Sequence, residues 1–407
     1  MRIAVLSEGF YPEVSGVTIA VARHLAFFAG RGHELLLVHP RYPDSVRGLF
    51  RASAPPAIPA EVVTFASTEL VKHRPETRAP TLRGAEEVEQ AISRFAPALV
   101  MYHNPDRLVP DLGVPWRRHR VAGLAAARTL AAAIVPLVHT LLPLYVERSA
   151  QWYWRVPIAS ALARRVWCGV YNEHFPERVV TFDVGVRDYL RSIGFAMPIL
   201  AGPWNGVDPA VFHPRSAAPQ PPDPAAPLRL VSVGRLVREK NAHLLPDLVR
   251  ALRASGLAFE LVIVGDGPLG PALREALATA PEVTWRGWQD PPAVAAELAR
   301  ADAYISLSDT ESFSLTAQEA VATGVPVVVP DVHGFRRLAA LDVGLLFPAS
   351  WLARAGMTSL AEALRARRPE FVRWARNAAE LAPTLTWDSA LTRFAAAIAA
   401  DTGLQGL

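Results

Sequence analysis

The sequence predicts an α/β protein that consists of two doubly wound domains. Its 407 residues exceed what one hydrophobic core usually organises, so two domains are expected. In both halves, short β-branched or aliphatic runs alternate with longer segments of helical periodicity, which is typical of parallel sheets covered by helices on both faces. A proline-rich stretch at 213–227 separates the halves, because neither a helix interior nor a central strand tolerates so many prolines.

Each half supplies its own set of strands. In the first half, helices are expected near 17–31 and 85–95, and the expected strands are 2–7, 34–39, 61–66, 98–103, 133–139 and 178–183. In the second half, terminal helices are expected after about residue 369, and the expected strands are 228–234, 259–265, 282–287, 302–308 and 325–331.

These elements set the domain boundaries. The N-terminal Rossmann-like domain is placed at 1–207, the linker at 208–227 and the C-terminal Rossmann-like domain at 228–385, and a last helix at 386–407 is expected to pack back on the N-terminal domain. When two such domains face each other, the carboxyl ends of both sheets and their loops open into one cleft. Substrates are expected to bind in that cleft.

Composition limits the class of protein. A single cysteine, Cys168, excludes an intramolecular disulfide and is compatible with a reducing cytosol. The chain opens on a strand-like segment, so no signal peptide is expected. The most apolar window, 130–146, is interrupted by prolines and does not predict a spanning helix. We therefore expect a cytoplasmic protein.

A basic and aromatic window lies at 116–165. It holds eight arginines and one acidic residue, interleaved with tryptophans and tyrosines. Such a surface suits an anionic membrane or an acidic substrate, and would place the protein peripherally on the inner face of the cytoplasmic membrane. The alternative is the solvated face of ordinary helices. The candidate residues for an acceptor or membrane face are Arg117, Arg118, Arg120, Tyr145 and Trp152.

Two loops suggest a site for phosphate groups. Gly16 precedes the first expected helix, where a glycine lets backbone amides approach a phosphate or a sugar, although a simple tight turn explains it equally well. Arg235 and Lys240 follow the strand at 228–234, and Lys240 is one of only two lysines in the chain. Two cations at a helix start form a candidate diphosphate clamp, and the alternative is a solvated, charged helix start.

Two further strands end in glycine. Gly265 closes the strand at 259–265 in a G-x-G turn that opens the next helix, and by itself it predicts only a turn. Gly287 closes the strand at 282–287, where exposed backbone amide and carbonyl groups could read the edge of a nucleobase.

The stretch "DTESFSLTAQEA" carries two glutamates, one before and one within an expected helix. Glu311 lies in the loop, and Glu319 lies about two turns into the helix, so that both reach the same cleft. The amides of Ser314, Leu315 and Thr316 are unsatisfied donors at the helix start. A nucleotide sugar fits this layout, with its sugar hydroxyls at one carboxylate, its ribose hydroxyls at the other and its diphosphate between them.

The order of the motifs resembles the retaining GT-B glycosyltransferases, and most closely glycosyltransferase family 4. The resemblance extends over nearly the whole chain, and its parts are "FYPEVSGV", "HTLLPLY", "NGVDPAVFHP", "GRLVREKN", "VGDGP", "RGW", "ESFSLTAQE" and "EAVATGVPVVVPDVHG".

The resemblance implies a role for several residues. Glu319 would bind the ribose of the donor, and Glu311 the transferred sugar. Arg235 and Lys240 would hold the diphosphate. Gly16 would let the N-terminal loop close on the donor, and His139 would reach the sugar from the acceptor-binding N-terminal domain, a satisfied histidine at a strand end being the alternative.

Two positions depart from the family pattern. The family commonly has glycine where Ser314 stands, and a glycine pair where this chain reads "VSGV". The charged residues are unaffected. The implied reaction retains the configuration at the anomeric carbon, and Arg235 and Lys240 would stabilise the departing diphosphate.

The expected substrates are a UDP- or GDP-linked hexose and a hydroxyl acceptor such as a lipid or cell-envelope glycoconjugate. No D-x-D motif and no His/Cys cluster with metal-ligand spacing occurs, so no cofactor and no obligatory metal is expected, and no nucleic acid partner either. Two alternatives remain: a nucleotide-sugar epimerase or phosphorylase with the same architecture, and a binding protein without turnover.

Overall fold

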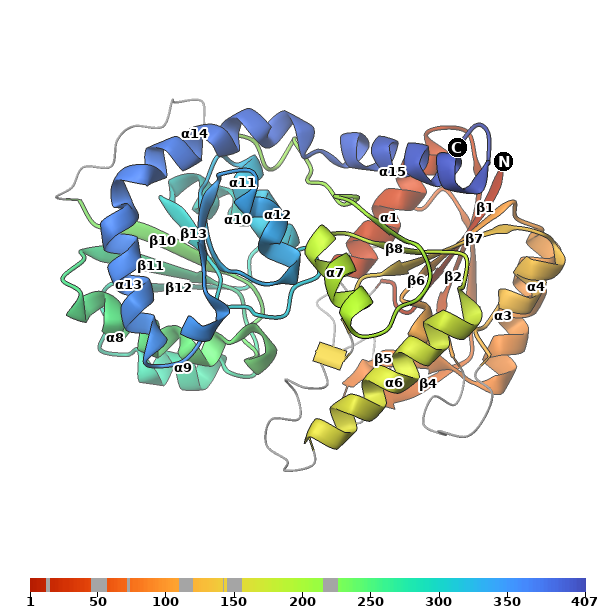
Figure 1. Ribbon diagram of the computed structural model, residues 1–407, viewed down its shortest axis with the longest axis horizontal. Coiled ribbons are helices and arrows are strands. Elements are labelled where there is room, and N and C mark those ends of the chain that lie inside the picture. The colour runs from red at the N-terminus through yellow and green to blue at the C-terminus, as the bar shows by residue number, and fades with distance from the viewer. Residues whose placement is uncertain are drawn as a thin grey trace.

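The computed structural model consists of two α/β lobes joined side by side (Figure 1). It describes residues 1–11, 15–44, 57–71, 74–109, 120–141, 143–144, 156–214 and 226–407. The predicted α/β class, with two Rossmann-like halves, is confirmed. Most of the proline-rich stretch, 215–225, lies outside the described residues.

The N-terminal domain is built on a parallel sheet in the order β3-β2-β1-β6-β7-β8-β9. The order reverses between β1 and β6, which is the arrangement of a doubly wound sheet. Its strands are β1 (Arg2–Ser7), β2 (Glu34–Pro40), β3 (Glu61–Phe65), β6 (Leu99–His103), β7 (Ala133–Val138), β8 (Val179–Thr181) and β9 (Ile199–Ala201).

Apolar layers cover both faces of this sheet. Four successive residues of β1, from Ile3 to Leu6, have no exposed surface, which explains why the strand is a continuous apolar run. The helices of this domain are α1 (Gly16–Ala29), α3 (Leu82–Phe95), the short η1 (Pro105–Leu108), α4 (Leu124–Thr129), α6 (Val156–His174) and α7 (Val184–Ser192). An antiparallel hairpin of β4 (Ser67–Val71) and β5 (Arg74–Pro80) is added beside α3.

The C-terminal domain repeats the plan with the order β12-β11-β10-β13-β14-β15. All pairs in this sheet are parallel. Its strands are β10 (Leu228–Val233), β11 (Phe259–Val264), β12 (Val283–Gly287), β13 (Ala303–Ile305), β14 (Val327–Pro330) and β15 (Gly344–Phe347).

Helices again enclose the sheet (Figure 1). They are α8 (Leu245–Ala254), α9 (Gly270–Ala276), α10 (Pro291–Arg300), α11 (Leu315–Ala322), α12 (Arg336–Ala339), α13 (Gly356–Arg367) and α14 (Phe371–Leu381). Short 3₁₀ turns connect them: η2 (Arg238–Lys240), η3 (Ala242–Leu244), η4 (His333–Phe335), η5 (Ala349–Trp351), η6 (Arg368–Glu370) and η7 (Ala382–Thr384).

The last helix, α15 (Trp387–Thr402), leaves the C-terminal domain and lies along the N-terminal one (Figure 1). Trp387 and Phe394 are buried in the same apolar cluster as the strands and α1 of that domain, and Arg178 pairs with Asp401. Just before α15, the Val207 amide donates to the Leu385 carbonyl at 2.8 Å, so the two chain crossings between the domains lie side by side.

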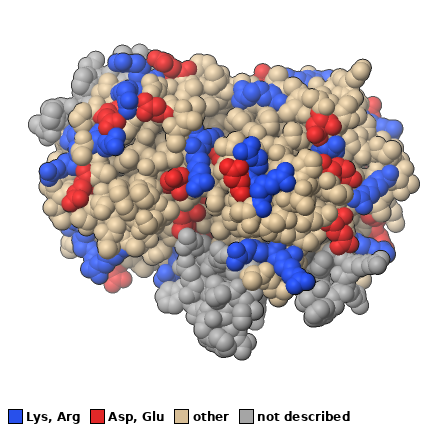
Figure 2. Space-filling model, in the orientation of Figure 1, with Lys and Arg blue, Asp and Glu red and all other residues tan. Residues whose placement is uncertain are grey.

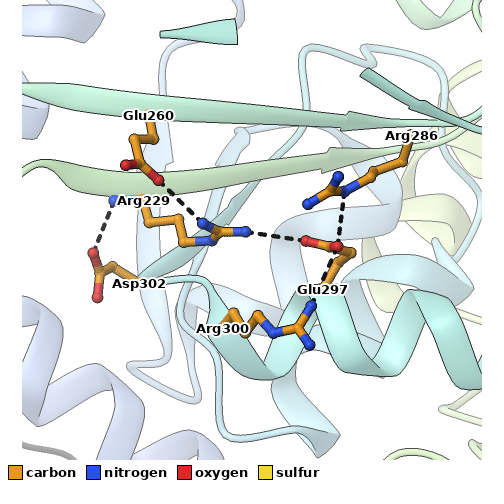
Figure 3. Close-up of polar contacts among 6 residues, drawn as sticks. All are labelled: Arg229, Glu260, Arg286, Glu297, Arg300 and Asp302. Atoms are coloured by element: carbon orange, nitrogen blue, oxygen red, sulfur yellow. Dashed lines mark hydrogen bonds and ion pairs between the residues drawn. The ribbon is translucent and has the colours of Figure 1, made fainter. Parts of the chain in front are cut away.

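An ion network ties α10 to the strands behind it (Figure 3). The buried carboxylate of Glu297 accepts from Arg229 of β10 at 3.1 Å, from Arg286 of β12 at 2.9 Å and from Arg300 at 3.4 Å. Arg229 also pairs with Glu260 of β11 at 3.0 Å. Since several cations share one desolvated carboxylate, this network fixes α10 on the sheet.

Candidate active site

The loop between β13 and α11 has an unusual backbone. Ser314, the N-cap of α11, adopts the left-handed conformation with φ 57° and ψ 85°, and its hydroxyl accepts from the Ala317 amide at 3.4 Å. The left-handed region favours glycine, which explains why the family pattern has glycine at this position. A second chain segment supports the loop closely, since a Cβ at Gly334 would lie 2.6 Å from the Glu311 carbonyl oxygen.

The two predicted carboxylates flank the start of α11. Glu311 is in the loop, and its Oε1 accepts from Lys240 Nζ at 2.6 Å. Glu319 lies within α11, and although it keeps some exposed surface, protein surrounds its carboxyl so closely that burial raises its pKa to about 7. Near neutral pH the site therefore holds one paired carboxylate and one carboxyl that titrates.

Lys240 and Arg235 are held differently. Lys240 ends the 3₁₀ turn η2 and pairs with Glu311, whereas Arg235 is 62% exposed at its side chain and approaches Glu239 at 4.0 Å. The ammonium beside Glu311 reduces the electrostatic cost of bringing an anion to this carboxylate. The sequence could not show this pairing, which joins two loops of different strands.

The glycines of the C-terminal domain allow close approach of loops. Gly265 has φ 134°, and a Cβ there would lie 1.9 Å from the Gly234 carbonyl oxygen. The Gly265 amide donates to the Gly287 carbonyl at 2.7 Å, so the carbonyl that the sequence offers to a nucleobase already has one internal partner. Gly287 itself has φ 65°, with nothing within 4 Å of a Cβ.

The starts of two helices from different domains meet. Gly16 is the first residue of α1, which Ser15 caps, and a Cβ at Gly16 would lie 3.6 Å from Leu315 Cδ1 at the start of α11. Thr316 follows Leu315 in the first turn, where backbone amides lack intrahelical acceptors. Two positive helix ends therefore converge at the domain junction, which favours an anionic group there.

The N-terminal domain adds a polar group at the ends of β1, β6 and β7. Asn104, with φ 54°, donates from Nδ2 to Glu8 Oε1 at 2.6 Å, and its Oδ1 accepts from the His139 amide at 2.7 Å. Glu8 also pairs with Arg107 at 2.7 Å. Neither Glu8 nor Asn104 was predicted from the sequence, although each is a polar residue directly after an apolar strand.

His139 is brought to the domain junction. Its ring packs on Phe182 with centroids 4.4 Å apart, and Phe182 packs on Phe313 of the Glu311 loop at 6.3 Å. Burial lowers the pKa of His139 to about 3, so the ring is neutral at physiological pH. Its closest polar partner is His103, whose Nδ1 lies 2.8 Å from His139 Nε2.

A largely buried arginine also supports the Glu311 loop. Arg337 donates to the carbonyl oxygens of Phe313 at 2.8 Å and Gly334 at 2.9 Å, and to Gln318 Oε1 at 3.0 Å. It lies 3.5 Å from Asp183, the N-cap of α7 in the other domain. The contact depends on tertiary packing and could not be predicted from the sequence.

The acceptor or membrane face remains a prediction. Arg117, Arg118, Tyr145 and Trp152 lie outside the described residues, and Arg120 is exposed. On the side shown in Figure 2, basic and acidic side chains are interspersed. None of the helices in the described ranges is both long and apolar enough to cross a membrane. Within those ranges, no cluster of His, Cys, Asp or Glu has the composition of a metal site.

Known proteins share parts of this sequence. Residues 227–365 match the family described as "Glycosyl transferases group 1". A GDP-mannose-dependent alpha-mannosyltransferase from Corynebacterium glutamicum is 27% identical over 346 residues, covering 82% of this chain and 73% of the relative. A GDP-mannose-dependent alpha-(1-6)-phosphatidylinositol dimannoside mannosyltransferase from Mycobacterium tuberculosis is 34% identical over 192 residues, covering 44% of this chain and 50% of the relative.

A solved structure settles the architecture. A sucrose-phosphate synthase from Thermosynechococcus elongatus superposes with a TM-score of 0.69 at 17% identity, covering 99% of both chains. The chain has the GT-B fold, as its motifs predicted. Together with the sequence matches, this supports a glycosyltransferase that uses a nucleotide sugar.

Proposed function

We propose that the protein is a retaining glycosyltransferase of family 4 that transfers mannose from GDP-mannose to a hydroxyl of a cell-envelope glycolipid. The observation that carries the proposal is the arrangement at the start of α11, with Glu311 of the preceding loop paired to Lys240 at 2.6 Å and with the carboxyl of Glu319, within α11, closely surrounded by protein. The donor and the acceptor class follow from the names of the mannosyltransferases that resemble this chain.

The donor would lie along the start of α11. Its diphosphate would meet the amides of Leu315 and Thr316 together with Lys240 and Arg235. Glu319 would accept from the ribose hydroxyls, and Glu311 from the hydroxyls of the sugar. His139 would reach the sugar from the N-terminal domain. Backbone amides, a helix end and two cations form a preorganised set of positive charge that needs little rearrangement when the leaving group becomes more negative.

The chemistry breaks the bond between the anomeric carbon and the diphosphate oxygen. The acceptor hydroxyl attacks from the face that the diphosphate leaves, and its proton passes to the departing diphosphate oxygen. Stabilisation of that oxygen lowers the barrier more than a strong base would, and Lys240 supplies the charge. We propose that the reaction needs no metal, and that the protein works in the cytoplasm at the membrane that holds its acceptor.

A transfer assay tests the proposal. Purified protein is incubated with GDP-mannose and mannosylated phosphatidylinositol, with and without EDTA, and the product is analysed by NMR. We expect an α-mannosyl product formed equally well in EDTA. A β-linked product would overturn the retaining mechanism, and transfer that EDTA abolishes would overturn metal independence.

Two variants test the assigned residues. Glu319→Ala is expected to raise the KM for the donor, and Glu311→Ala to lower kcat by about a hundredfold, since it removes an interaction with the reacting sugar. Arg253→Ala, which removes an exposed cation paired with Glu282 in the same domain, is the matched control and is expected to leave both constants unchanged. Wild-type kinetics in both glutamate variants would refute the assignment.

A further inference from the structure

Three buried histidines adjoin one another in the N-terminal domain. The ring centroids of His24 and His103 are 5.1 Å apart, and those of His103 and His139 are 4.9 Å apart. Burial lowers the pKa of all three, to about 3 for His24 and His139 and well below the usual value for His103. Each ring is therefore neutral near pH 7 and carries one N–H.

His103 and His139 share one hydrogen bond. Nδ1 of His103 lies 2.8 Å from Nε2 of His139, so one of these nitrogens carries the proton and the other accepts it. If His103 donates, its proton is on Nδ1 and that of His139 is also on Nδ1. If His139 donates, both protons are on Nε2. Nδ1 of His139 is therefore a hydrogen-bond donor in the first arrangement and an acceptor in the second.

The surroundings of His103 distinguish these arrangements. Within the described part of the chain, His103 Nε2 is a fully buried atom without a hydrogen-bond partner. If His139 were the donor, this nitrogen would carry a buried N–H with no acceptor, which is rare in folded proteins. An unused lone pair at the same place is less unfavourable. The lack of an acceptor for Nε2 among the described residues favours His103 as the donor, with its proton on Nδ1.

The second nitrogen of His139 then faces outward as an N–H. The backbone of His139 is held by Asn104, and its ring is fixed between His103 and Phe182. His139 is 8% exposed, whereas His103 has no exposed surface. Within the described ranges, Nδ1 of His139 is not one of the fully buried side-chain atoms that lack a hydrogen-bond partner. Phe182 in turn contacts Phe313, so one aromatic side chain connects the His139 ring to the loop that carries Glu311.

We propose that His103 is a positioning residue, which holds His139 in the tautomer that presents an Nδ1–H donor, and not a base, to an oxygen of the bound donor. That this oxygen belongs to a sugar hydroxyl or a phosphate rests on the proposed function. The assignment of the tautomer does not. A neutral N–H donor helps to orient the sugar without taking the proton of the acceptor. His139 thus supports a reaction in which the leaving diphosphate receives that proton.

The tautomer is measured directly by NMR. Protein labelled with ¹⁵N-histidine, without any substrate, gives long-range correlations between ring protons and ring nitrogens that distinguish protonated from unprotonated Nδ1. The His139 signals are assigned by their loss in His139→Gln. We expect a protonated Nδ1 and an unprotonated Nε2 for His139. The opposite pattern would overturn the proposal whether or not the protein transfers mannose.

Two substitutions of His103 test its positioning role. The amide nitrogen of Asn occupies the place of Nδ1 and can donate to His139, so His103→Asn is expected to retain the tautomer and most of kcat. His103→Leu cannot donate, and we expect kcat to fall about tenfold, as for the loss of one hydrogen bond, with the proton of His139 moving between its nitrogens.

His24→Leu is the matched control, because His24 is equally buried and its ring nitrogens make no hydrogen bond within the described residues. We expect it to retain kcat and the His139 tautomer. If His24→Leu reduces kcat as much as His103→Leu, the effect is one of packing, and the positioning role is refuted. The spectrum of the unsubstituted protein still decides the tautomer if a leucine variant does not fold.

Discussion

Ionisation of Glu319 at the domain junction lowers the stability of the folded state. Its pKa rises from 4.5 to about 7 because burial disfavours the charged form. Below pH 4.5 the carboxyl is protonated in both the folded and unfolded states, so it has no effect on stability. As the pH rises from 4.5 to 7, the unfolded chain releases its proton first, and the unfolding free energy falls. Above pH 7 the full cost of at most about 3 kcal/mol remains.

Glu319→Gln is therefore expected to raise the unfolding free energy by about 2 kcal/mol at pH 8 and to change it little at pH 4.5. Chemical denaturation at the two pH values measures the difference. Glu297→Gln is the control, because Glu297 binds three arginines and its loss leaves them without their shared carboxylate. Glu297→Gln is expected to lower the unfolding free energy of the protein at pH 8. A Glu319→Gln effect that is equal at both pH values would contradict the argument.

Ser314 combines a favourable side chain with an unfavourable backbone. Its hydroxyl caps α11, but φ 57° disfavours any residue with a Cβ. Ser314→Gly relieves the backbone and loses little capping, whereas Ser314→Ala loses the cap and keeps the Cβ. We expect Ser314→Ala to cost about 1 kcal/mol and Ser314→Gly to be at least as stable as the wild type, as measured by thermal denaturation. Equal stability of the two variants would disprove the strained conformation.

At the scale of elements, Arg337 connects α12 and the Glu311 loop to α7 of the other domain. Its side chain is only 14% exposed, so desolvation lowers its pKa to about 10, and burial raises the pKa of Asp183 despite the nearby guanidinium. Arg337 and Asp183 stabilise the folded protein only when both are present, since removing one partner leaves the charge of the other buried without compensation.

Arg337→Leu is therefore expected to lower the unfolding free energy by about 3 kcal/mol or more. Adding Asp183→Asn should recover part of this loss, because Asn can still cap α7 without a charge. Denaturation of the two single variants and the double variant completes the cycle. Losses that simply add would show that the two side chains do not interact.

The helix α15 contributes to the core of the domain that it joins. Phe394 is fully buried and stacks on His24 with centroids 5.1 Å apart. Phe394→Ala is expected to cost about 3 to 4 kcal/mol through the cavity that it leaves, and Arg393→Ala, on the exposed side of the same helix, should cost almost nothing. Equal unfolding free energies of the two variants in denaturant would show that α15 is not part of this core.

The sequence predicted the strands that are buried on both faces, because each is a continuous apolar run, as in β1 and β14. It did not predict β9 or β15, which are only three and four residues long, nor the hairpin β4–β5, whose residues are largely polar. Strands of this kind depend on their neighbours more than on their own residues.

The site residues also differ in how far the sequence predicts them. Glu311 and Glu319 could be selected from the sequence because they lie close together in it, in a loop and in the helix that directly follows. The hydrogen bond of His103 with His139 and the pair of Arg337 with Asp183 could not be predicted, since each joins different strands or domains. The tertiary fold decides which polar residues at strand ends meet.

At the scale of the whole molecule, residues of both domains meet at the candidate site. Gly16 and Leu315 bring the starts of α1 and α11 together, and His139 reaches the Glu311 loop through Phe182. We propose that this junction binds the nucleoside diphosphate of a sugar donor through amides, cations and carboxylates.

Calorimetric titration of the protein with GDP, UDP, ADP and dTDP, each with and without EDTA, tests this binding. The account predicts that GDP binds most tightly, that EDTA does not change its affinity, and that Lys240→Ala weakens it about tenfold, as for the loss of one charged contact. Failure of all four nucleotides to bind would contradict the account, and so would undiminished GDP binding by Lys240→Ala.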